Sequence, residues 1–185
     1  MSTTPFEQAL SQGLEATRAS ATEVALAALR AASRIEPAHP LPHFLIGANL
    51  AASGQPEAAE AAYAESLRLD PAQGVARFQL GLLQLLRGDL AGASTTWRPV
   101  LDDPAEHPLR LFAQGLLEVA RGNTGLAKVL IERGIDIGPG NAALNADMRG
   151  VLGRMTSAGA VADRDAKAAA NAAGQHFLIN NYGRS

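Results

Sequence analysis

The hydrophobic and polar positions of this 185-residue chain divide it into successive apolar segments, separated by short stretches rich in Gly, Pro and polar residues. The segment RFQLGLLQLLRGD, residues 77–89, carries leucine or phenylalanine on almost every face of a helix between its two arginines. Abundant Ala and Leu, with few β-branched and aromatic residues, favour helices over strands. The pattern predicts helices over 5–18, 21–35, 41–53, 56–69, 74–87, 90–102, 108–121, 124–137 and 141–155.

Residues of the same type recur along this pattern with a period of 34 residues. The recurring positions are Gly13, Gly47, Gly81 and Gly115; Ala25, Ala59, Ala93 and Ala127; Gly54, Gly88 and Gly122; Phe44, Phe78 and Phe112; and Pro37, Pro71 and Pro139, with Pro104 one residue early. Glycine inside a helix costs about 1 kcal/mol relative to alanine, so its recurrence indicates close passage of another backbone. We expect the recurring alanine to face it.

Helix ends follow the same period. Gly54, Gly88 and Gly122 are expected to end the first helix of each pair in the left-handed conformation, and the prolines to end the second helix. Ser20 with Glu23 predicts a capping box at the start of the helix over 21–35.

The stretch GANLAASGQPEAAEAAYAESLRLDP, residues 47–71, resembles the tetratricopeptide repeat (TPR) family, whose unit is a 34-residue helix pair. The resemblance implies an all-α, right-handed superhelix, an α-solenoid of antiparallel helix pairs. It divides the chain into a repeat domain over 1–157 and a C-terminal tail over 158–185. The units are 6–39, 40–73, 74–107 and 108–141, followed by a capping helix over 141–155. In the tail we expect a weak helix over 161–173 and a short apolar end.

The resemblance also implies that one stripe of each first helix faces the concave groove of the superhelix. The residues predicted for this peptide-binding groove are Leu41, Phe44, Ala48, Val75, Phe78, Leu82, Leu85, Leu109, Phe112, Leu116 and Val119. An apolar trough of this kind suits an extended peptide or an amphipathic helix with apolar anchors. Three alternatives stay open: the C-terminal segment fills the trough, a dimer mate fills it, or the phenylalanines only pack against neighbouring units.

Charge and composition exclude several other kinds of partner. With 16 Lys and Arg against 18 Asp and Glu, and no long run of one charge, no nucleic acid is expected. No cysteine is present, and neither a leader-like N-terminus nor an apolar run of about 18 residues occurs. We therefore expect a soluble cytoplasmic protein without membrane insertion.

Candidate catalytic and metal-binding groups are sparse. His39 and His43 are four residues apart, but Pro40 and Pro42 are expected to break the helical face that a metal pair needs. The Asp102–Asp103 pair is more simply explained as a helix terminus than as an acid–base dyad. Because no phosphate-binding loop occurs either, we expect no enzyme activity, no catalytic residue, no metal and no cofactor.

The pattern thus favours a non-enzymatic scaffold or adaptor that binds an apolar peptide or amphipathic helix of a partner protein. A bacterial secretion-type TPR chaperone is one alternative, and a self-assembling protein that forms homo-oligomers through residues 160–185 is another. Stripe positions that would carry the Lys, Asn and Arg of a TPR carboxylate clamp are apolar, which disfavours acidic C-terminal tails in the groove.

Arg87 and Arg121 suit a helix C-terminus electrostatically or would hold an acidic partner at the groove edge.

Overall fold

A computed structural model describes residues 3–103 and 106–157 of the chain. These residues form nine α-helices and no strand. The helices are α1 Pro5–Arg18, α2 Thr22–Ile35, α3 Pro40–Ala52, α4 Pro56–Leu69, α5 Gly74–Leu86, α6 Leu90–Leu101, α7 Pro108–Ala120, α8 Thr124–Ile137 and α9 Ala142–Ser157. All nine predicted helices are confirmed, with every end within two residues of its expected position.

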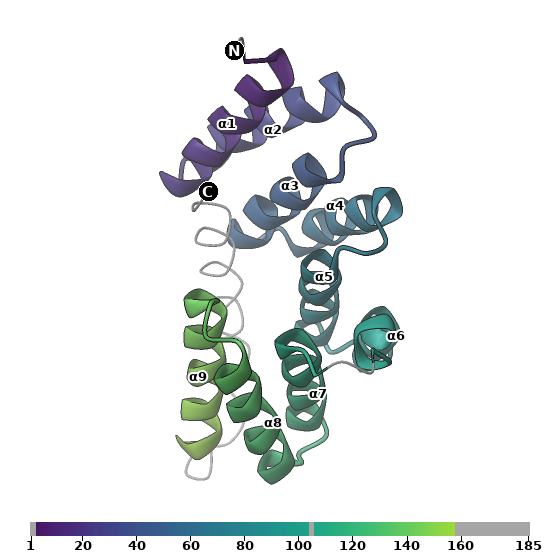
Figure 1. Ribbon diagram of the computed structural model, residues 1–185, viewed down its shortest axis with the longest axis vertical. Coiled ribbons are helices and arrows are strands. Elements are labelled where there is room, and N and C mark those ends of the chain that lie inside the picture. The colour runs from purple at the N-terminus through teal and green to yellow at the C-terminus, as the bar shows by residue number, and fades with distance from the viewer. Residues whose placement is uncertain (1–2, 104–105, 158–185) are drawn as a thin grey trace. The chain divides into compact units, whose positions relative to one another are not determined.

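Consecutive helices pack against each other as pairs. Helix α1 lies beside α2, α3 beside α4, and α7 beside α8 (Figure 1), while Phe78 of α5 stacks on Trp97 of α6. Further contacts join α2 to α3, α6 to α7 and α8 to α9. This is the local arrangement of an α-solenoid. Two compact units divide the described chain between Ala76 and Arg77, within α5.

The recurring glycines make room for a large side chain of the second helix in each pair. An added Cβ at Gly81 would stand 2.5 Å from Trp97 Cε2, and one at Gly47 would stand 2.8 Å from Tyr63 Cδ1. Gly13 and Gly115 face Leu29 and Ile131 in the same way. The expected alanine partners are fully buried nearby, but the closest neighbour of each glycine is the residue four positions after the alanine.

Ser20 does not cap α2, which corrects the predicted capping box with Glu23. Its φ is 55°, and α2 begins after Ala21 without any side-chain cap. Ser20 stands 34 residues before Gly54, so it takes the left-handed position that Gly54, Gly88 and Gly122 occupy in the later pairs. The structure has its capping box at α1 instead, where Thr4 Oγ1 accepts from Glu7 N and Glu7 Oε2 accepts from Thr4 N.

Histidines begin two of the helices. His39 Nδ1 accepts a hydrogen bond from Leu41 N at 3.3 Å, at the start of α3, and His107 Nδ1 accepts one from Leu109 N at 3.2 Å, at the start of α7. Helix α3 begins at Pro40 and includes Pro42, so His39 stands outside the helix in extended conformation and only His43 of the two lies within it. Proline is compatible with a first helical turn, whose N–H groups have no partner within the helix.

Helix α9 covers the end of the last helix pair. It packs on α8, and its Leu144 and Met148 are buried. The Asn141 side chain accepts from Leu144 N at 3.1 Å, and Asn145 Nδ2 donates to the Gly138 carbonyl at 2.7 Å. The predicted tail helix over 161–173, the apolar end and the homo-oligomer contact through 160–185 lie outside the described residues.

Candidate functional site

The three phenylalanines of the predicted stripe are interior residues. Their exposed fractions are 1% for Phe44 and 0% for Phe78 and Phe112. The ring centroid of Phe44 lies 5.8 Å from that of Tyr63, and that of Phe78 lies 5.7 Å from that of Trp97. Their rings are thus covered by the second helix of the same pair. This corrects the expectation that the rings line an open trough.

Gly134 of α8 shows the same packing for Phe112. A Cβ at position 134 would come within 2.8 Å of Phe112 Cδ1, so the glycine leaves space for the ring.

Other members of the stripe are also largely enclosed. Ala48, Leu82, Leu109 and Leu116 are buried, and Leu41, Val75, Leu85 and Val119 are half-buried. The stripe therefore supplies much of the core of the helix pairs. Peptide binding along it stays a prediction.

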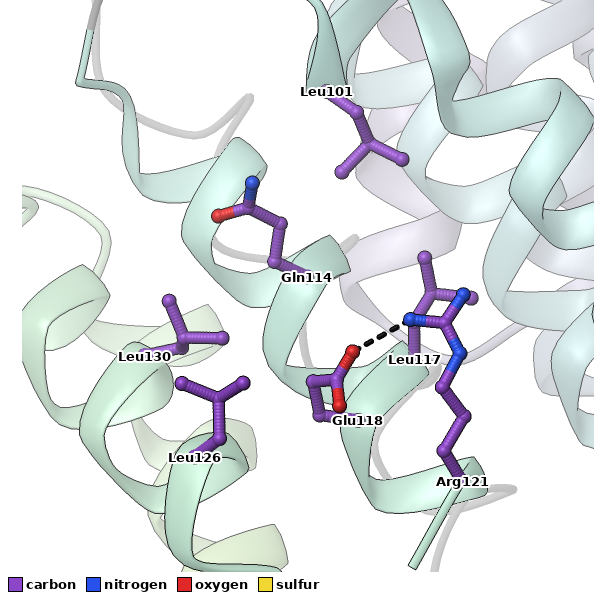
Figure 2. Close-up of a pocket in the computed structure, with 7 residues that line it drawn as sticks. All are labelled: Leu101, Gln114, Leu117, Glu118, Arg121, Leu126 and Leu130. Carbon is purple, nitrogen blue, oxygen red and sulfur yellow. Dashed lines mark hydrogen bonds and ion pairs between the residues drawn. The ribbon is translucent and has the colours of Figure 1, made fainter. Parts of the chain in front are cut away.

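An open pocket of about 390 Å³ lies in the second unit, between α6, α7 and α8 (Figure 2). Its lining residues are Leu101, Gln114, Leu117, Glu118, Arg121, Leu126 and Leu130. Leu126 and Leu130 point from α8 toward α7, and Leu117 forms a buried part of the wall. None of these residues belongs to the predicted stripe.

Apolar side chains next to the pocket are exposed on α8. Leu126 is 52% exposed and Val129 is 62% exposed, whereas Ala127 and Ile131 on the opposite side of the helix are fully buried. An apolar surface beside an open pocket is typical of a binding site rather than of scattered surface residues.

The sequence did contain a signal for this site. Position 126 corresponds to Gly92 in the third pair and Ala58 in the second, and position 130 corresponds to Thr96 and Ala62. Leucine at both positions is thus specific to the fourth pair. A repeat pattern is defined by the residues that recur, so leucines that depart from it do not stand out in it.

Glu118 and Arg121 form the polar edge of the pocket. Arg121 Nη1 donates to Glu118 Oε1, and Asn123 Nδ2 donates to Glu118 Oε2. These hydrogen bonds, from Asn123 first and Arg121 second, hold the pKa of Glu118 below its ordinary value. A carboxyl group with a lowered pKa is ionised near neutral pH and is a poor proton donor, so the edge is suited to binding and not to general acid catalysis.

The described residues offer no other candidate chemistry of these kinds. Within 3–103 and 106–157, no three His, Asp or Glu side chains gather as metal ligands would. In the same ranges, every helix is too short or too polar to span a bilayer. Comparison with known proteins finds no family model and no curated protein sequence that matches the chain.

Proposed function

We propose that this protein is a non-enzymatic TPR-type interaction module that binds an apolar segment of a partner protein. The observation that carries the proposal is the leucine-lined pocket between α6, α7 and α8, with Leu126 and Val129 exposed beside it. We therefore propose this pocket, and not the buried phenylalanines, as the docking surface.

Membership in the TPR family and a right-handed superhelix are part of this proposal. The 34-residue period and the consecutive helix pairs support both. A chain without cysteine suits a reducing compartment, and we propose a cytoplasmic location.

Physical chemistry favours occupation of the pocket by an apolar side chain. A leucine-sized anchor contributes about 1.5–3 kcal/mol when it is fully buried. Helix α8 supplies the outward leucine while its buried residues, Ala127 and Ile131, hold it against α7.

The test uses two equivalent positions of the repeat. A photo-crosslinking amino acid replaces Val129, cross-linked proteins are identified by mass spectrometry, and each candidate is purified for affinity measurement. Leu126→Lys should weaken binding at least about tenfold, which corresponds to about 1.4 kcal/mol. The control is Val24→Lys, because Val24 precedes Leu126 by three periods and is 60% exposed on α2.

A partner that binds both variants as tightly as the native chain would contradict the proposed site. Equal weakening by both substitutions would also contradict it, since it would show a general effect of added charge. Circular dichroism of each variant checks that the helices are intact.

A further inference from the structure

The pocket edge presents its two charges unequally to a ligand. The Glu118 side chain is 13% exposed and both of its oxygens accept hydrogen bonds from the chain itself. The Arg121 side chain is 48% exposed, and it uses Nη1 for Glu118. A guanidinium carries five N–H donors, so Arg121 keeps donors for a further acceptor.

Gln114 adds a second donor, on helix α7. Its side chain lines the pocket and is half-buried, and no hydrogen bond joins its amide to the described part of the chain. Gln114 lies on α7 and Arg121 directly follows the last residue of this helix, with Leu117 between them (Figure 2). The pocket therefore combines apolar walls with two groups that can donate to an incoming carboxylate.

This combination is specific to the fourth helix pair. In the third pair Leu80 stands in the place of Gln114, and Thr96, in the place of Leu130, donates its hydroxyl to Gln84 Oε1 at 2.7 Å. In the third pair the Thr96–Gln84 hydrogen bond thus lies at the position where Leu130 forms an apolar wall of the pocket in the fourth pair.

We infer that the pocket recognises a peptide segment in which an apolar anchor, such as leucine, is accompanied by Asp or Glu within about four residues, one helical turn. The anchor enters between Leu101, Leu126 and Leu130, and the carboxylate accepts hydrogen bonds from Arg121. The charge of Glu118 does not oppose this ligand strongly, because Arg121 neutralises it and Asn123 donates a hydrogen bond to its other oxygen. This inference rests on the proposed function, since it names the chemistry of the partner for the same pocket.

The probe is a displayed library of random 12-residue peptides, selected on the full chain. Selected sequences are then synthesised with a fluorescent label for anisotropy titrations. We expect enriched peptides to contain the apolar–acidic pair. Leu126→Lys should abolish their binding, and Arg121→Ala should weaken it about five- to tenfold. The matched control is Arg87→Ala, one period earlier, which should leave affinity unchanged.

Two further measurements separate a ligand contact from a structural effect of Arg121. When the Asp or Glu of the peptide is replaced with Asn or Gln, the native chain and Arg121→Ala should bind the peptide with equal affinity. Glu118→Gln should tighten binding of the acidic peptide, because it removes the competing carboxylate from Arg121. A merely structural role for the Glu118–Arg121 pair predicts weaker binding for both variants and would overturn the inference.

The outcomes also distinguish the two proposals. Binding that requires Leu126 but is unaffected by Arg121→Ala overturns the acidic specificity and leaves the apolar pocket as the docking site. Both proposals are contradicted if the selected peptides bind Leu126→Lys as tightly as the native chain, or if the selection enriches no peptide.

Discussion

Ser20 holds a backbone conformation that the later helix pairs assign to glycine. With φ at 55°, its Cβ is strained in a way that glycine avoids. We expect Ser20→Gly to raise the free energy of unfolding by about 0.5–1 kcal/mol, because relief of strain exceeds the added chain entropy of glycine. Urea titration measures the change. The reverse substitution Gly88→Ser, at φ 84°, should lower stability, and a stable Gly88→Ser would contradict this account.

Gly81 is required by the indole of Trp97. Trp97 is fully buried and its Nε1 donates to the Phe78 carbonyl at 3.0 Å, so the ring has little freedom to move away from a new methyl group. We expect Gly81→Ala to lower the free energy of unfolding by about 1–3 kcal/mol, since overpacking outweighs the better helix propensity of alanine. Thermal or urea unfolding provides the measurement.

Gly125→Ala is the control for Gly81→Ala. A Cβ at position 125 in α8 would have no neighbour within 4 Å, so this variant should be as stable as the native chain or more stable. Destabilisation of the same size at both positions would rule out the Trp97 contact as the cause.

The burial of Phe78 and the backbone conformation of Ser20 could not be predicted from the pattern of residue types. A helical angle places Phe78 on a stripe, but whether that stripe is open depends on the size of Trp97 and on the space at Gly81, which are properties of the packed pair. Ser20 fitted a capping box by residue type, and only its period relative to Gly54 indicated the left-handed position.

Helices α1 and α3 are joined by a buried polar pair. Asn49 Nδ2 donates to Thr17 Oγ1 and to the Leu45 carbonyl, both at 2.9 Å, and Thr17 Oγ1 donates to the Gly13 carbonyl at 2.8 Å. The corresponding residues of the fourth pair are apolar, Leu117 for Asn49 and Val119 for Thr17.

The hydrogen bonds predict that substitutions of Thr17 and Asn49 lower the free energy of unfolding by unequal amounts. Thr17→Val should cost about 1–3 kcal/mol, because it leaves Asn49 Oδ1, which lies 3.3 Å from Thr17 Oγ1, buried without a partner. Asn49→Leu should cost less, since Thr17 keeps its bond to Gly13, and the double variant should recover most of the Thr17→Val loss. A double-mutant cycle from urea unfolding checks this, and additive losses would contradict it.

At the level of elements, helix positions were predictable because the signals are local. Helix ends depend on Pro, Gly and the start of each apolar segment, which the sequence displays directly. The pocket was not predictable in the same way, because α6, α7 and α8 each contribute to it and the gap depends on how their side chains fill the space. Leu126 and Leu130 were visible in the sequence only as departures from the period.

For the whole molecule, the division within α5 predicts that destabilisation stays in the unit where it is introduced. Repeat proteins gain stability from each repeat and from its nearest neighbours, so distant helices are coupled only through those between them. Leu29 and Ile131 occupy the same position of the first and fourth pairs, and both are fully buried. Replacing either with alanine should cost about 2–5 kcal/mol.

Hydrogen exchange of the two variants shows which helices lose amide protection. Leu29→Ala should lower amide protection mainly in α1 to α4, and Ile131→Ala mainly in α6 to α9, because the boundary lies between Ala76 and Arg77. Helix α5 crosses the boundary and should respond to both substitutions. An equal loss of protection in all nine described helices would instead show that the chain unfolds as one cooperative unit.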